Sequence, residues 1–199
     1  PETRPREESL PVTAEEVERR HRTLLDNADA LAWLFRERRI PRAIAERYKL
    51  GLVYWNGDPK SPGGSAEFFY PIRTGSGWFP AARRYRPHAP KLKKRIWLPP
   101  FAKAAAPGEK IKAPLWGAVE ASESKATRIL AFEGEDKALA VSALNFPDTA
   151  CVSTTAGAGH WPSLWSNVIS GKNLVYIADT DTPGLAAIAA HPRLIHPVE

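Results

Sequence analysis

The sequence predicts an α/β protein in which a parallel sheet flanked by helices follows a smaller, basic α+β subdomain. Two short apolar runs, at residues 128–132 and 174–178, have the composition of buried parallel strands, and each ends in carboxylates. Helical segments alternate with these runs, which is typical of parallel strands joined by crossovers. Charge also divides the chain: residues 1–126 carry 24 Lys and Arg against 15 Asp and Glu, whereas residues 127–199 carry 4 against 7.

Composition narrows the class of protein. The 199 residues are 43% apolar and 25% charged, as in ordinary globular domains. No apolar stretch has the length of a membrane span and no signal peptide is recognisable, so we expect a cytoplasmic protein with no membrane partner. The single cysteine, Cys151, excludes an internal disulfide and a Cys-based zinc cluster.

Three regions are expected along the chain. Residues 1–12, with three prolines and several charges, are interpreted as a flexible linker, residues 13–112 as the basic α+β subdomain, and residues 113–199 as the α/β domain. The chain begins at Pro1 and contains no methionine, which suits a piece excised from a longer polypeptide.

The basic subdomain is predicted to begin with helices. Thr13 followed by Glu15 and Glu16 is a helix-start signature, and the helix is expected to run to Asp26. Apolar residues recur at helical spacing over 27–46, which predicts further helical structure there. Within this stretch Pro41 is expected to open a second, short helix. The arginines of this stretch are interpreted mostly as a solvated face.

Strands and a basic segment follow. Residues 52–55 are predicted to form a strand, and residues 68–72 and 77–81 a hairpin around the turn at 74–77. Residues 83–95 hold seven cations and no carboxylate, and two prolines exclude a regular helix. Such a segment favours binding of a phosphate backbone, although a basic loop without that role is the alternative.

The acidic C-terminal part is predicted to alternate strands and helices. After the strand at 128–132 we expect a helix at 136–144 and a strand at 150–153 that ends in a Gly-rich loop at 154–159. The later elements expected are a short helix at 162–168, the strand at 174–178, a helix at 183–190 and a last strand at 194–196.

Carboxylates gather where these strands end. Glu133 follows the first apolar run, and Asp179 and Asp181 follow the run at 174–178. Ligands of open α/β sheets bind outside the carboxyl ends of the strands, and clustered carboxylates call for a cation. Oxygen ligands suit Mg²⁺ or Mn²⁺. The alternative is that Glu133 and Asp181 only cap helices.

These motifs resemble a known family. The segment 132–135 (Phe-Glu-Gly-Glu), followed by 179–181 (Asp-Thr-Asp) with Gly184 behind it, is similar to the TOPRIM domain of bacterial-type primases, topoisomerases and certain nucleases. Residues 30–51, 69–72, 82–91 and 114–117 resemble successive segments of the primase catalytic core. The likeness covers about residues 27–199 and looks closest to phage or plasmid primase–helicases.

The resemblance implies a DNA primase (nucleotidyltransferase) that copies single-stranded DNA into short RNA primers from NTPs, in a bacterium or a phage-infected host. It implies that Glu133 is the catalytic acid that assists proton transfer, and that it contributes to the metal site. Asp179 and Asp181 would hold Mg²⁺ or Mn²⁺. Template and nucleotide would be bound by basic residues, namely Arg83, Arg84, Arg86, Lys91, Lys93, Lys94 and Lys112.

Three departures from the family pattern stand out. Members usually carry an Asp four residues after the motif-one Glu, and here that place is Lys137, with Asp136 one residue earlier. This fragment shows no zinc-binding module, although such primases normally carry one upstream, so the module is an expected partner. No helicase part follows either, so a replicative helicase, fused or separate, is an expected partner. Both gaps suit an excised catalytic core.

Two rival functions are kept. A TOPRIM-type nuclease would use the same acids and metal to cleave phosphodiesters, but it does not explain the primase-like segments before residue 113. A non-catalytic nucleic-acid-binding module would keep the basic segment without needing the carboxylates. Primer length, initiation sequence, sugar preference and oligomeric state are left open.

Overall fold

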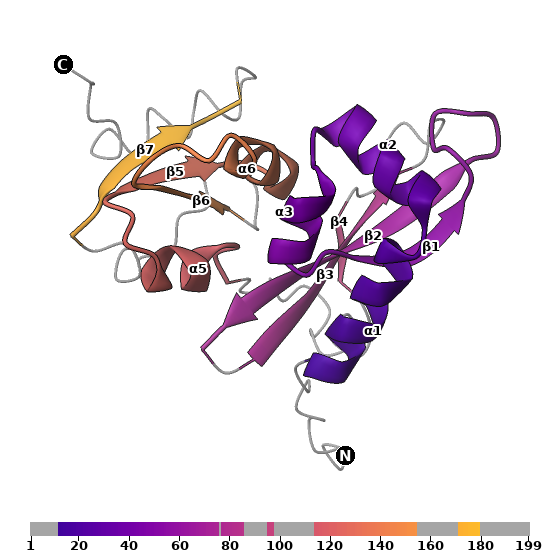
Figure 1. Cartoon of the computed structure of the whole chain (residues 1–199), viewed down its shortest axis with the longest axis horizontal. Coiled ribbons are helices and arrows are strands. Elements are labelled where there is room, and N and C mark those ends of the chain that lie inside the picture. The colour runs from indigo at the N-terminus through magenta and orange to yellow at the C-terminus, as the bar shows by residue number, and fades with distance from the viewer. Residues whose placement is uncertain (1–11, 76, 86–94, 98–113, 155–170, 180–199) are drawn as a thin grey trace, which may run out of the picture. The chain divides into compact units, whose positions relative to one another are not determined.

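The computed structural model describes residues 12–75, 77–85, 95–97, 114–154 and 171–179 (Figure 1). Those residues divide into two compact units. The first holds 12–33, 45–71, 77–85 and 95–97; the second holds 34–44, 72–75, 114–154 and 171–179. The linker, subdomain and domain limits expected from the sequence stay predictions. The predicted helices at 162–168 and 183–190 and the strand at 194–196 lie outside the described residues.

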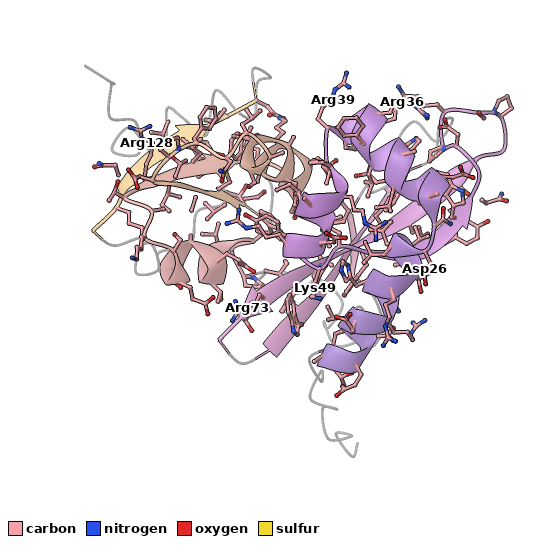
Figure 2. The ribbon with its side chains drawn as sticks, viewed as in Figure 1. Asp26, Arg36, Arg39, Lys49, Arg73 and Arg128 are labelled. Atoms are coloured by element: carbon pink, nitrogen blue, oxygen red, sulfur yellow. The ribbon has the colours of Figure 1, made fainter. Side chains whose placement is uncertain are left out.

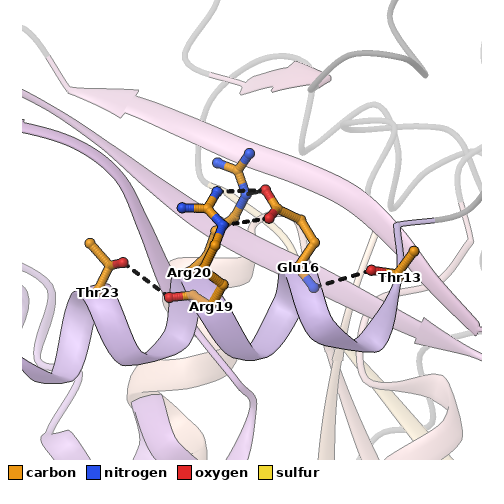
Figure 3. Close-up of polar contacts among 5 residues, drawn as sticks. All are labelled: Thr13, Glu16, Arg19, Arg20 and Thr23. Carbon is orange, nitrogen blue, oxygen red and sulfur yellow. Dashed lines mark hydrogen bonds and ion pairs between the residues drawn. The ribbon is translucent and has the colours of Figure 1, made fainter.

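The N-terminal helices confirm the sequence prediction. They are α1 (Ala14–Leu25), α2 (Ala28–Arg38) and α3 (Arg42–Arg47), with Pro41 directly before α3. The hydroxyl oxygen of Thr13 accepts a hydrogen bond from the Glu16 backbone N–H at 3.2 Å, which satisfies one free donor of the first turn (Figure 3). The Glu16 carboxylate also accepts hydrogen bonds from Arg19 and Arg20, and its bond to Arg19 lowers the pKa of Glu16.

A four-stranded sheet follows these helices. Its strands are β1 (Gly51–Asn56), β2 (Ser65–Thr74), β3 (Gly77–Tyr85) and β4 (Arg95–Trp97), in the order β1-β2-β3-β4. The predicted hairpin is confirmed by the adjacency of β2 and β3, which are linked by only two residues. Strand β4, antiparallel to β3, was not predicted, because its three residues lie at the end of the basic segment.

Aromatic packing holds the first unit together. The Trp33 ring stacks on Phe68, with 5.5 Å between centroids, and is tilted against Tyr85 at 4.8 Å. The Trp33 indole N–H donates to Asp58 Oδ1 at 3.0 Å, so its polar end is also satisfied. At the start of β1, Gly51 leaves room for α1: a Cβ there would lie 2.9 Å from the Arg20 carbonyl carbon.

The second unit contains a three-stranded parallel sheet. Strands β5 (Arg128–Phe132), β6 (Thr149–Ser153) and β7 (Asn173–Ile177) are parallel, as the sequence predicted, and they lie in the order β6-β5-β7. Helix α6 (Glu135–Ser142) follows β5 and contacts β5 and β6, and it is close to the helix predicted at 136–144. Helix α5 (Ala118–Glu123) was not predicted.

An apolar cluster binds α5 to one face of this sheet. Its buried members come from the approach to α5, from α5 itself and from all three strands: Leu115, Ala118, Ala121, Ile129, Ala131, Val152 and Leu174. Because neighbouring residues of a strand face opposite ways, Leu130 and Phe132 project from the other face. The central strand is thus buried along almost its whole length, which fixes the position of its carboxyl end.

Trp116 and Gly117 anchor the entry to α5. Trp116 exchanges two backbone hydrogen bonds with Ser153 of β6, at 3.1 and 3.0 Å, and its side chain is almost fully buried. Gly117 has a φ of 77°, and a Cβ on it would lie 2.6 Å from the Cys151 carbonyl oxygen. Only glycine combines that backbone conformation with so close an approach.

The exposed parts of the described helices are strongly charged. Arg36 of α2, which is exposed, and Arg39, which directly follows α2, point outward (Figure 2). This arrangement fits the solvated arginine face predicted from the sequence.

Among the described residues, none of the helices has the length and apolar character of a membrane span.

Candidate active site

Two carboxylates leave the parallel sheet at the same edge. Glu133 follows the last residue of β5, Phe132, and Asp179 lies two residues beyond Ile177, the last residue of β7. Phe132 and Ile177 are direct partners in the parallel ladder. Because neighbouring strands are about 4.8 Å apart, the two acids follow adjacent positions on one sheet edge. Both residues are partly exposed, so a ligand can reach them.

Glu133 is oriented by a tyrosine that the sequence did not single out. The Tyr176 hydroxyl, from β7, donates a hydrogen bond to Glu133 Oε1 at 3.0 Å. Burial raises the pKa of Tyr176 above its usual value, and the neighbouring Glu133 carboxylate raises it further. Tyr176 therefore remains a neutral donor at any ordinary pH. The available signal was a single tyrosine inside an apolar run, three residues before Asp179.

Asp179 is paired with the residue that departs from the family pattern. The Lys137 Nζ atom, from the first turn of α6, contacts Asp179 Oδ1. Their side chains are 49% and 38% exposed, so the pair lies at the surface of the sheet edge. Of the two acids at this edge, Glu133 and Asp179, it is thus Asp179 that carries an ammonium in direct contact.

The backbone around Glu133 is held at several points. The Thr154 N–H, just after β6, donates to the Phe132 carbonyl at 2.9 Å, and the Gly134 carbonyl accepts from the Lys137 N–H at 3.1 Å. Glu135 is buried in the first turn of α6. The N-cap of α6 is Gly134, without a side-chain capping bond, so the alternative that Glu133 merely caps this helix is wrong.

Asp136 is engaged elsewhere in the second unit. Its Oδ2 atom lies 3.8 Å from Arg38 Nε, an ion pair too long for a hydrogen bond. Asp136 is thus paired with Arg38, whereas Asp179 is paired with Lys137.

The chemistry of the donor set fits Mg²⁺ or Mn²⁺. Carboxylate oxygens are the ligands that these hard cations prefer, and Glu133 and Asp179 supply them at one edge. Within the described ranges no group of three or more acidic, histidine or cysteine side chains is close enough to enclose a metal ion. The third predicted ligand, Asp181, lies outside those ranges, and the Lys137 ammonium lies against Oδ1 of Asp179.

The basic candidates are only partly placed. The backbone of Arg83 and Arg84 belongs to β3. Their contacts with template or nucleotide stay a prediction. The remaining five lie outside the described residues: Arg86, Lys91, Lys93, Lys94 and Lys112.

Three solved structures have a similar fold. The DnaG catalytic core superposes with a TM-score of 0.59 at 15% sequence identity, over 88% of this chain and 63% of that one. The Aquifex aeolicus primase, comprising its zinc-binding and RNA polymerase domains, gives 0.60 at 18% identity, over 92% and 53%. The DnaG primase catalytic domain bound to single-stranded DNA gives 0.56 at 16%, over 87% and 61%.

This chain has the fold of the DnaG primase catalytic core. The predicted fold class, α/β with a TOPRIM fold, is thereby confirmed. The chain spans between 53% and 63% of the primase chains that it matches. It matches no protein-family model and no curated protein, so the likeness to primases is one of fold.

Proposed function

We propose that this chain is a primase catalytic core, which synthesises short RNA primers on single-stranded DNA from NTPs in a reaction that needs Mg²⁺ or Mn²⁺. One observation carries the proposal. Glu133 and Asp179 follow the carboxyl ends of paired parallel strands, β5 and β7, in a protein with the primase fold. In open α/β sheets that edge is where ligands bind.

Each acid has a proposed role. Glu133, held by the Tyr176 hydroxyl, accepts or relays the proton of the attacking hydroxyl group. Asp179, with Asp181, supplies oxygen ligands to the cation. When bound there, Mg²⁺ or Mn²⁺ would neutralise the triphosphate and lower the pKa of the attacking hydroxyl. The hydroxyl of the half-buried Tyr176 orients one carboxylate oxygen of Glu133, and the other oxygen is proposed to receive the proton.

Template binding is assigned to the basic segment. Arg83, Arg84, Arg86, Lys91, Lys93, Lys94 and Lys112 are proposed to contact phosphates of the template and the nucleotide, largely without sequence preference. One neighbour is a primase catalytic domain bound to single-stranded DNA, which supports the same kind of partner for this chain. Another contains a zinc-binding domain beside its RNA polymerase domain, which supports the proposal that such a module cooperates with this one. A replicative helicase is the further proposed partner.

The test is primer synthesis on single-stranded DNA with labelled NTPs and either Mg²⁺ or Mn²⁺. The unmodified chain should yield short RNA products only with the cation, and Asp179→Ala and Glu133→Gln should reduce the yield by at least about a hundredfold, as expected for loss of a metal ligand or general base. Asp29→Asn removes one exposed carboxylate in the first turn of α2 and should leave the yield unchanged.

Other outcomes separate the rival functions. Metal-dependent degradation of the template, abolished by Asp179→Ala, would establish a nuclease in place of a primase. Salt-sensitive binding of DNA without synthesis or cleavage, also after a zinc-binding module has been joined to the chain, would leave only a binding module.

A further inference from the structure

Lys137 occupies an electrostatically unfavourable place. It is the third residue of α6, and the first turn of a helix carries a partial positive charge that disfavours cations. Carboxylates offset this cost: Glu135 and Asp136 share the turn, and Asp179 contacts the Lys137 ammonium from the end of β7. The lysine is therefore held at the sheet edge by the same acid that is proposed to bind the metal.

The net charge at the sheet edge follows from this pair. Glu133 and Asp179 contribute two negative charges and Lys137 one positive charge, whereas an Asp at position 137 would make the total more negative by two. A divalent cation at Asp179 would be repelled by the ammonium at close range and would have to displace it. At an effective dielectric constant near 20, unit charges about 4 Å apart interact by several times the thermal energy.

The geometry allows that displacement. Both side chains are more than one-third exposed, so Lys137 can leave Asp179 without becoming a buried, unpaired charge. Its flexible four-carbon stem carries a compact point charge, which is the form in which lysine binds phosphate groups.

We propose that Lys137 is a built-in counter-ion of Asp179 that competes with the divalent cation and moves to the phosphate groups of an incoming nucleoside triphosphate. This inference rests on the proposed function and deepens it, because it makes the substrate responsible for opening the metal site. The free protein binds the cation weakly, and triphosphate and cation bind cooperatively. The cation displaces Lys137 from Asp179, which frees its ammonium for the triphosphate. The triphosphate in turn binds this ammonium and so keeps it away from the cation site.

The experiment measures Mn²⁺ binding by paramagnetic resonance titration, with no turnover required. Lys137→Gln should bind Mn²⁺ about tenfold more tightly than the unmodified chain, because a unit of nearby positive charge is lost. Lys137→Arg keeps the positive charge and should bind Mn²⁺ as weakly as the unmodified chain. Lys125→Gln is the matched control: Lys125 is exposed before the amino end of β5, the opposite end from Glu133, and its loss should leave the affinity unchanged.

A second titration tests the transfer to phosphate. A non-hydrolysable nucleoside triphosphate, whose own Mn²⁺ binding is measured separately and subtracted, should tighten Mn²⁺ binding to the unmodified protein more than to Lys137→Gln. Asp179→Asn should abolish the tight site in both backgrounds.

The outcomes distinguish this inference from the proposed function. Equal Mn²⁺ affinity of the unmodified chain and Lys137→Gln, with a loss in Asp179→Asn, would overturn the competition and leave the metal assignment standing. No Asp179-dependent Mn²⁺ binding in any variant would overturn both. Circular dichroism and thermal unfolding verify that each variant is folded.

Discussion

The hydroxyl of Tyr176 gives Glu133 a defined orientation, although neither residue is fully buried. A neutral donor at 3.0 Å constrains one carboxylate oxygen of Glu133, and the proposed proton transfer would use the other oxygen. The raised pKa of Tyr176 means that the hydroxyl keeps its proton beyond the pH at which free tyrosine ionises. Tyr176 is thus a positioning residue for Glu133.

Replacing Tyr176 by Phe tests this role. Because a hydrogen bond to a charged group contributes about 1.5–3 kcal/mol, we expect Tyr176→Phe to lower kcat of primer synthesis by about tenfold or more, with the nucleotide KM little changed. Steady-state kinetics with varied NTP concentration measure both parameters.

The control is Tyr54→Phe, which removes the hydroxyl of an exposed tyrosine in β1. It should leave kcat unchanged. A spectroscopic pH titration adds a readout independent of activity: the unmodified protein should contain one more tyrosine that resists ionisation above pH 10 than Tyr176→Phe does. Equal numbers of resistant tyrosines would contradict the assignment.

The acids at the sheet edge were accessible from the sequence, but their partners were not. Glu133 and Asp179 stand out because each ends an apolar run, a pattern local to a few residues. The contacts of Glu133 with Tyr176 and of Asp179 with Lys137 span more than forty residues and depend on strand register and on how α6 is placed. A single sequence carries no direct record of such distances.

Among the elements, the ones with strong local signals were predicted and the weak ones were missed. The predicted strand at 128–132 coincides with β5, and the Thr13 signature correctly places the start of α1. Helix α5 (Ala118–Glu123) was not predicted, because a helix of six residues is too short to show a hydrophobic period. It is instead stabilised by tertiary packing of Ala118 and Ala121 against the parallel sheet.

Gly117 offers a test at the scale of this element. Gly117→Ala should lower the free energy of unfolding by at least about 2 kcal/mol, because alanine would be strained at a φ of 77° and its Cβ would collide with the Cys151 carbonyl oxygen. Urea denaturation measures the change.

Gly171→Ala separates the two contributions. Gly171 has nearly the same φ, 76°, but a Cβ there would meet no atom within 4 Å. Gly171→Ala should lower the free energy of unfolding only by the strain of alanine at a positive φ, about 1 kcal/mol. If both variants lost equal stability, the close approach of Gly117 to β6 would have no energetic consequence.

The uneven charge of the whole molecule leads to a prediction about the proposed binding of nucleic acid. Residues 1–126 carry a net charge of +9 and residues 127–199 carry −3. We expect affinity for single-stranded DNA to fall steeply with salt. Replacing Lys91, Lys93 and Lys94 by Ala should reduce the slope of log K against log salt by about 2, since each phosphate contact contributes about 0.7 on single strands. Fluorescence anisotropy between low and moderate salt measures it.

A control with the same change in net charge replaces Arg22, Lys60 and Lys125, which are exposed and were not assigned to the template. Its slope should match that of the unmodified chain. If both triple variants lost the same slope, binding would depend on total charge, and the basic segment would have no specific part in it.

The sheet order β6-β5-β7 also has a consequence for how the protein is made. Strand β5 pairs on one side with β6 but must wait on its other side for β7, whose first residue lies more than forty positions later in the chain. Until β7 docks, one edge of β5 is an open template for other chains, which is a hazard for newly synthesised protein. Closing that long loop is also the slow, non-local step of assembly. Glu133 and Asp179 therefore become neighbours only after β7 has docked on β5, and a chain interrupted before β7 lacks the pair altogether.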